Sequence, residues 1–178
     1  YNRYLKRFER NNSKIVMRSA HLNADRARGI AGDGLYIDEV QNFIMGNIPI
    51  IRAVLNNSEL EYGPIEVISG TPLTFDNPIE RLWAVNSTQN MWLMRCDRCR
   101  HWNPPLWEQV GPRGLVCCKC GKALNPLMGK WVRTGREDAV YEGFHLSRAM
   151  MAYTSIGSPE LFKHRWQSFY DDVNANTQ

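Results

Sequence analysis

The chain has 178 residues, of which 43% are apolar, and a formal net charge of +4. This length and composition can bury one substantial core and a small second module. No stretch approaches the roughly 18 uninterrupted apolar residues of a membrane-spanning helix, so we expect no membrane role. Because the sequence opens on Tyr1 without an initiator Met or an apolar leader, we expect a piece of a longer chain.

Charge is unevenly distributed along the chain. Residues 1–30 carry eight Lys or Arg against two acids and residues 95–136 carry nine against two, whereas residues 31–94 carry two against eight. Basic blocks suit a polyanion such as a nucleotide or a DNA backbone, but they are also typical of a solvated surface without a ligand. Charge alone leaves both interpretations open.

The first clear element is the apolar run Gly34-Leu35-Tyr36-Ile37, which ends in Asp38 and Glu39. Such a run predicts a buried parallel strand, and acids at its carboxyl end lie where open α/β sheets bind ligands. This is the layout of a Walker B motif, in which Asp38 holds Mg²⁺ and Glu39 orients and deprotonates the water that attacks a γ-phosphate. The alternative is that the acids only cap the next helix.

The surrounding elements follow from apolar spacing. Before the acids, we expect the end of a helix over 4–10, a strand over 14–19 and a polar loop or irregular helix over 20–30. After them, a helix over 47–57 and a strand over 65–68 predict a βαβ crossover with neighbouring parallel strands. Further predicted elements are a helix from 77 to about 88, strands over 91–95, 129–133 and 141–146, and a helix from 158 with a core aromatic stripe.

Two Cys-x₂-Cys turns stand seventeen residues apart, formed by Cys96, Cys99, Cys117 and Cys120. This spacing predicts a closed, structural Zn²⁺ site with four thiolates, joined by a β-ribbon over 102–116. Disulfides are the alternative, but five cysteines is an odd number and no secretory signal is present. Gly121 follows the second pair where a left-handed residue is wanted, so Cys118 is the spare thiol.

Several short motifs follow one another along the chain. They are, in order, Ser19-Ala20, Arg26-Ala27-Arg28-Gly29, Leu35-Tyr36-Ile37-Asp38-Glu39, Ser69-Gly70-Thr71-Pro72, the cysteine pairs and Tyr141-Glu142-Gly143-Phe144-His145. Together they resemble the large terminase subunit of tailed bacteriophages, in the lambda-type GpA family. The resemblance runs over nearly the whole chain, although Walker B and the Ser-Gly-Thr stretch are shared with many helicase-like ATPases.

The resemblance implies an α/β fold: the C-terminal part of a P-loop ATPase of the RecA-like type, with a mostly parallel sheet and an inserted zinc ribbon. Residues 1–95 would belong to the ATPase core and residues 96–124 to the ribbon. Residues 125–178 would supply strands that rejoin the main sheet and a helix toward a nuclease domain outside the sequence.

The implied function is an ATP-driven motor that moves double-stranded DNA into procapsids in the host cytoplasm. Its partners would be the small terminase subunit and the portal protein, and the full-length protein would form a homo-oligomeric ring. Asp38 and Glu39 would be the Walker B pair, and Ser69-Gly70-Thr71 would couple hydrolysis to motion. Arg28, or else Arg26, would reach a neighbouring subunit's γ-phosphate, the alternative being solvated charges.

The sequence departs from the family in one respect, because it contains no Gly-x₄-Gly-Lys-[Ser/Thr] phosphate loop. Family order places this loop upstream of Tyr1 and the nuclease acids beyond Gln178, so we expect half an ATP site. A second interpretation is a superfamily-2 helicase. The Asp-Glu-x-x motif of these enzymes usually ends in His or Asp, whereas here Val40-Gln41 follows the two acids. A third interpretation is a zinc-ribbon module that binds nucleic acid or assists assembly without catalysis.

Overall fold

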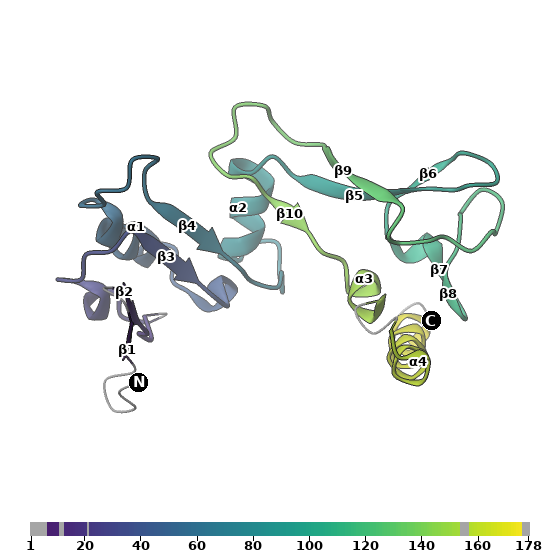
Figure 1. Ribbon diagram of the computed structural model, residues 1–178, viewed down its shortest axis with the longest axis horizontal. Coiled ribbons are helices and arrows are strands. Elements are labelled where there is room, and N and C mark those ends of the chain that lie inside the picture. The colour runs from purple at the N-terminus through teal and green to yellow at the C-terminus, as the bar shows by residue number, and fades with distance from the viewer. Residues whose placement is uncertain (1–6, 11–12, 21, 154–156, 176–178) are drawn as a thin grey trace. The chain divides into compact units, whose positions relative to one another are not determined.

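The computed structural model describes residues 7–10, 13–20, 22–153 and 157–175. The chain forms two compact units, Tyr1–Leu82 and Trp83–Gln178, and each is described by itself (Figure 1). Among the described residues, no helix is long and apolar enough to cross a membrane.

The first unit opens on a hairpin. β1 (Arg7–Arg10) and β2 (Ser13–Val16) pair antiparallel, with Arg7 opposite Val16. The strand predicted over 14–19 is thus confirmed in its first half. The helix predicted over 4–10 is wrong from Arg7 onward, and its first residues lie outside the described part. A ladder with β2 gives this segment backbone partners that so short a helix could not match.

A single parallel crossover follows. β3 (Gly34–Ile37) leads through η2 (Val40–Asn42), α1 (Asn47–Arg52) and η3 (Ala53–Leu55) to β4 (Ile65–Ile68). β3 and β4 pair in parallel, so the predicted βαβ crossover is confirmed. The helix is shorter than predicted because its last turn tightens into the 3-10 helix η3.

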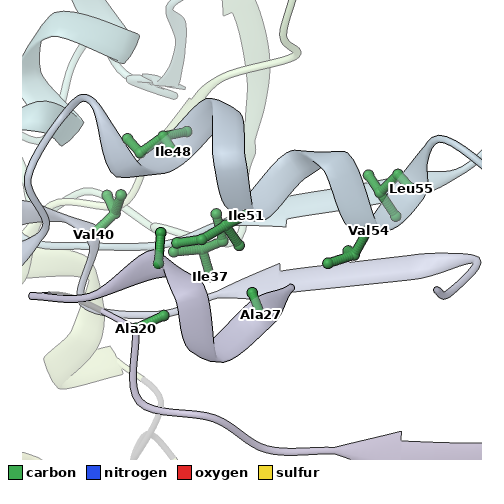
Figure 2. Packing of buried hydrophobic residues seen from close by; sticks show 9 residues of the cluster. Ala20, Ala27, Ile37, Val40, Ile48, Ile51, Val54 and Leu55 are labelled. Atoms are coloured by element: carbon green, nitrogen blue, oxygen red, sulfur yellow. The ribbon is translucent and has the colours of Figure 1, made fainter. Parts of the chain in front are cut away.

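One face of the β3–β4 pair carries the core of the first unit. Ile37 packs with side chains of α1, η3 and the 3-10 helix η1 (Ala24–Ala27), as Figure 2 shows. The buried members of this cluster are Ala20, Ala24, Ala27, Ile37, Val40, Ile48, Ile51, Val54 and Leu55. The opposite face, built from alternate residues, is exposed: Tyr36 at 67%, Ile65 at 61% and Val67 at 42%.

A four-stranded sheet organises the second unit. α2 (Pro78–Asn86) leads into β5 (Asn90–Arg95), which pairs antiparallel with β6 (Trp102–Asn103) and β9 (Gly129–Arg133) and parallel with β10 (Phe144–His145). The predicted strands are confirmed, the last only in its second half, at Phe144–His145. The strand predicted over 141–146 was expected to rejoin the main sheet, and in the structure β10 pairs with β5.

The expected mostly parallel sheet does not form. In the described part, β3–β4 and β5–β10 are parallel, whereas β1–β2, β5–β6, β5–β9 and β7 (Val110–Gly111) with β8 (Gly114–Leu115) are antiparallel. The described fold is therefore mixed α/β with small sheets. The physical reason is connection length, because tight turns and the cysteine module join most neighbouring strands and such links favour antiparallel pairing.

The C-terminal helices pack on the cysteine module. Trp166 of α4 (Pro159–Ala175) is 2% exposed, and its Nε1 donates to Gly111 O at 2.9 Å. Leu115 N donates to Tyr153 Oη at 2.8 Å, just after α3 (Arg148–Ala152). α4 confirms the helix predicted from 158, and the packing of Trp166 with Phe162 and Phe169 confirms the core role of its aromatic stripe.

Candidate functional site

The two motifs of the first unit meet at one edge of the parallel strand pair. Asp38 directly follows β3 and Ser69 directly follows β4, and these strands lie side by side in Figure 1. Ser69 Oγ donates to Asp38 Oδ1 at 2.6 Å, and Glu39 N donates to the same oxygen at 3.0 Å. Within the described residues, Asp38 Oδ2 has no hydrogen-bond partner.

Glu39 has an unusual backbone. Its φ of 55° and ψ of 39° are left-handed, a conformation that residues other than glycine rarely adopt. Glu39 stands at the N-cap of η2, yet its side chain makes no capping hydrogen bond. The alternative that these acids only cap the next helix therefore finds no support in the hydrogen bonds of η2.

The acids line an open cleft of about 540 Å³. Two segments supply its lining, namely Arg18, Ser19 and Ala20, and Asp38, Glu39, Asn42 and Phe43. Sequence reasoning missed Arg18, because it assigned residues 14–19 to a plain strand. β2 ends at Val16, and the residues after it form one wall of the cleft. A guanidinium beside two carboxylates suits a phosphate that carries a divalent cation.

The arginine loop lies elsewhere on the first unit. Arg28 ends η1, and its Nε donates to Asp25 Oδ1 at 2.5 Å in an ion pair whose side chains are 65% and 68% exposed. Neither Arg28 nor Arg26 is among the residues that line the acidic cleft. An exposed position is compatible with action on another subunit, and that role stays a prediction.

The four predicted cysteine ligands come together in the second unit. The sulfur atoms of Cys96, Cys99, Cys117 and Cys120 lie within 4.8 Å of one another. Across the two turns, Sγ–Sγ distances are 3.7 Å from Cys96 to Cys120 and 3.5 Å from Cys99 to Cys117. A tetrahedron with Zn–S bonds of about 2.3 Å has S–S edges of about 3.8 Å. The cluster could thus hold a metal ion such as zinc, while the exposed Cys118 lies outside it.

The two cysteine turns share one backbone geometry. Arg100 N donates to Cys96 O at 3.0 Å, and Gly121 N donates to Cys117 O at 2.8 Å. The residue that donates is left-handed in both turns, with φ 62° at Arg100 and φ 68° at Gly121. The left-handed position expected at Gly121 is confirmed, whereas the first turn places a residue with a side chain there.

Asn103 joins the two turns, and sequence reasoning missed it as well. Its side chain is fully buried; Nδ2 donates to His101 O at 2.9 Å, and Oδ1 accepts from Cys118 N at 3.1 Å. Because Asn103 lies among apolar and proline residues in the sequence, it was predicted only to pack within the β-ribbon. The available signal is that a buried amide in so small a module must find partners on both of its atoms.

Two thiols of the cluster have pKa values shifted in opposite directions in the absence of a metal ion. Burial raises the pKa of Cys117, but hydrogen bonds with the backbone of Lys119 and Cys120 and with other thiols outweigh it and lower the pKa to about 6. The hydrogen bond with the backbone of His101 lowers the pKa of Cys99, yet burial and thiol hydrogen bonds raise it to about 12. Cys117 is therefore the first of the two to ionise.

A partly exposed tryptophan on the second unit is flanked by cations. Trp102 is 38% exposed and stands opposite Arg95 across the β5–β6 pair. Lys130 Nζ lies 4.9 Å and Arg95 Cζ 5.8 Å from its ring centroid. Both distances are within the range of cation–π interactions.

Comparisons of the chain with known protein families, with curated proteins and with solved structures find no match. The sites are accordingly interpreted from their own geometry. The acidic cleft offers carboxylates and a guanidinium, but the 178 residues hold no phosphate loop that would cradle a nucleotide.

Proposed function

We propose that the chain is part of a terminase large subunit that hydrolyses ATP to drive double-stranded DNA into a procapsid in the host cytoplasm. The observation that carries the nucleotide part is the hydrogen bond from Ser69 Oγ to Asp38 Oδ1 at the shared edge of two parallel strands. In open α/β sheets, ligands bind beyond the carboxyl ends of the strands. The packaging role rests on the order of the motifs in the sequence.

Asp38 fits a magnesium ligand. Ser69 Oγ and Glu39 N hold Oδ1 and orient the carboxylate, which leaves Oδ2 for a cation, directly or through water. Mg²⁺ would neutralise charge on the β- and γ-phosphates. Glu39 takes the proton of the attacking water, Arg18 adds positive charge in the same cleft, and Arg28 or Arg26 acts on a neighbouring subunit.

The proposal requires a phosphate loop from outside these 178 residues. The exposed apolar face of the β3–β4 pair agrees with this requirement, since Tyr36, Ile65 and Val67 lie together on it. Parallel sheets are ordinarily covered on both faces, and the remainder of a nucleotide-binding domain would cover this one. We expect negligible ATP hydrolysis by the isolated chain and substantial hydrolysis by a longer protein that supplies the loop. Robust turnover by the isolated chain, abolished by Glu39→Gln, would contradict the requirement.

Zinc is the metal we assign to the cysteine cluster. Four thiolates fill all four tetrahedral positions, so the site is structural and leaves no water for chemistry. One zinc per chain is expected by metal analysis. Cys118→Ser should keep that zinc and Cys117→Ser should lose it. The reverse pattern would overturn the ligand assignment.

A second candidate function is a nucleic-acid-binding module without catalysis, and Trp102 between Arg95 and Lys130 favours it. Aromatic rings that stack on bases and cations that neutralise phosphates recur in such surfaces. Trp102→Ala should weaken DNA binding several-fold, whereas Trp107→Ala, at a tryptophan that is 68% exposed, serves as the control. Binding that depends on Trp102 in a longer protein without ATPase activity would favour this candidate over the motor.

A further inference from the structure

The side chain of Gln41 touches both motifs of the first unit. Its Nε2 donates to Glu39 Oε2 at 2.6 Å, and its Oε1 accepts from Thr71 N at 3.0 Å. Thr71 is thirty residues away along the chain. A single planar amide thus joins the predicted catalytic carboxylate to the loop that follows β4.

The partners fix the orientation of this amide. A carboxylate oxygen can only accept a hydrogen bond, and a backbone N–H can only donate one. The reversed amide would set Oε1 against the carboxylate of Glu39 and Nε2 against the N–H of Thr71, which loses both bonds. The bridge is therefore specific to a glutamine amide in this orientation.

Gly70 leaves the room that the bridge needs. A Cβ added at Gly70 would lie 2.5 Å from Gln41 Oε1 and 3.2 Å from Val40 Cγ1, closer than side chains pack. Each residue of the Ser69-Gly70-Thr71 motif therefore serves the acidic segment. The Ser69 hydroxyl donates to Asp38, Gly70 leaves space for the Gln41 side chain, and the backbone N–H of Thr71 donates to Gln41.

We propose that Gln41 is a positioning residue that holds Glu39 and passes a movement of its carboxylate to the loop at Thr71. The bridge links the two because both bonds belong to one rigid amide. If Glu39 turns toward an attacking water, the Gln41 amide must turn with it, which either breaks its hydrogen bond with Thr71 N or moves Thr71. The backbone N–H of Thr71, and not its hydroxyl group, is then the atom that responds to the movement of Glu39. This role rests on the ATPase function proposed above.

Three variants in the intact protein separate the two bonds. Gln41→Met removes both while keeping the side chain's length. Gln41→Glu keeps an acceptor for Thr71 N but sets a like charge against Glu39. Gly70→Ala pushes the Gln41 amide away from the loop without changing a hydrogen-bonding group. Gln167→Met, at an exposed glutamine of α4 in the other unit, is the matched control.

We expect Gln41→Met and Gln41→Glu to lower kcat for ATP hydrolysis ~10-fold or more with little change in KM, since misplacing a reacting group costs this much. Gly70→Ala should retain more of the hydrolysis but move less DNA per ATP consumed. Gln167→Met should change neither quantity. Wild-type kcat and wild-type DNA movement in Gln41→Met would overturn the proposal.

Amide hydrogen exchange provides a readout that does not depend on activity. Without nucleotide, Thr71 N should exchange roughly 5-fold faster in Gln41→Met than in wild type or Gln167→Met, because one hydrogen bond is lost. Unchanged exchange at Thr71 would refute the bridge even if the enzyme is slowed. If Glu39→Gln hydrolyses ATP normally, the proposed function fails instead. If Glu39→Gln is inactive while Gln41→Met is normal, only the role of Gln41 fails.

Discussion

At the scale of single residues, the two cysteine turns carry different residue types at the same left-handed position. Arg100 and Gly121 both adopt left-handed φ angles, at 62° and 68°. A Cβ raises the energy of this conformation, and only glycine adopts it freely. An added Cβ at Gly121 would meet nothing within 4 Å, so the difference between the turns is one of backbone energy alone.

Exchanging the residue type at these positions should change stability in opposite directions. Arg100→Gly should raise the free energy of unfolding of the zinc-loaded protein by about 1 kcal/mol, and Gly121→Ala should lower it by about 1 kcal/mol. Urea unfolding followed by tryptophan fluorescence measures both. A less stable Arg100→Gly variant would show that the arginine side chain contributes more than its backbone costs.

The unequal pKa values of Cys99 and Cys117 predict how zinc binding depends on pH. Zinc binds thiolates, so every thiol proton must leave on binding. Cys99, with its pKa raised to about 12, is protonated throughout pH 5–8 in the metal-free protein. Cys117, with its pKa lowered to about 6, is protonated at pH 5 and ionised at pH 8. The protons released per zinc should therefore fall by about one across this range. Calorimetry in buffers of different ionisation enthalpy tests this prediction, and a constant proton release would contradict the lowered pKa of Cys117.

At the scale of elements, Asn103 holds the cysteine module together without touching the metal position. Asn103→Leu removes the acceptor of Cys118 N and one of the two donors to His101 O, which keeps its hydrogen bond from Cys96 N. Because an unsatisfied buried group costs about 1–3 kcal/mol, we expect the free energy of unfolding to fall by about that amount and zinc binding to weaken. Asn125→Leu, at an exposed asparagine that accepts from Leu127 N, is the control. Equal effects of the two changes would remove the special role of Asn103.

How far the elements could be predicted depends on what determines them. The cysteine turns and the 34–68 crossover follow from local spacing, and the structure has both. The strand at Arg7–Arg10 follows from its pairing with β2, a contact that helical spacing does not report. Asn103 and Gln41 each also bond a partner fifteen or thirty residues away, and a single sequence does not show which distant residue that partner is.

At the scale of the whole molecule, the two candidate sites belong to separate compact units, the acids to Tyr1–Leu82 and the cysteines to Trp83–Gln178. The expected division at residues 95 and 124 stays a prediction. All six tryptophans lie in the second unit, so their fluorescence reports on it alone. The prediction of a mostly parallel sheet was wrong because the direction of neighbouring strands depends on which strands pair, and a single sequence does not show the pairing.

Zinc removal should therefore act on one unit. A chelator should change tryptophan fluorescence, since Trp166 packs on the cysteine module. Amide exchange at Val40 and Ser69, which bridge β3 and β4, should stay within about 2-fold of the zinc-loaded protein, because their hydrogen bonds lie in the other unit. Loss of protection at Val40 and Ser69 together with the fluorescence change would show that the two units unfold together.

We propose that Asp38 and Glu39 form the hydrolytic centre of an ATPase. ATP binding and ATP hydrolysis by the intact protein, measured with and without Glu39→Gln, test this role. This change keeps the size of the side chain and the Asp38 carboxylate but removes the base. ATP should bind with near wild-type affinity while hydrolysis falls by ~10² or more. Hydrolysis near the wild-type rate would contradict the claim.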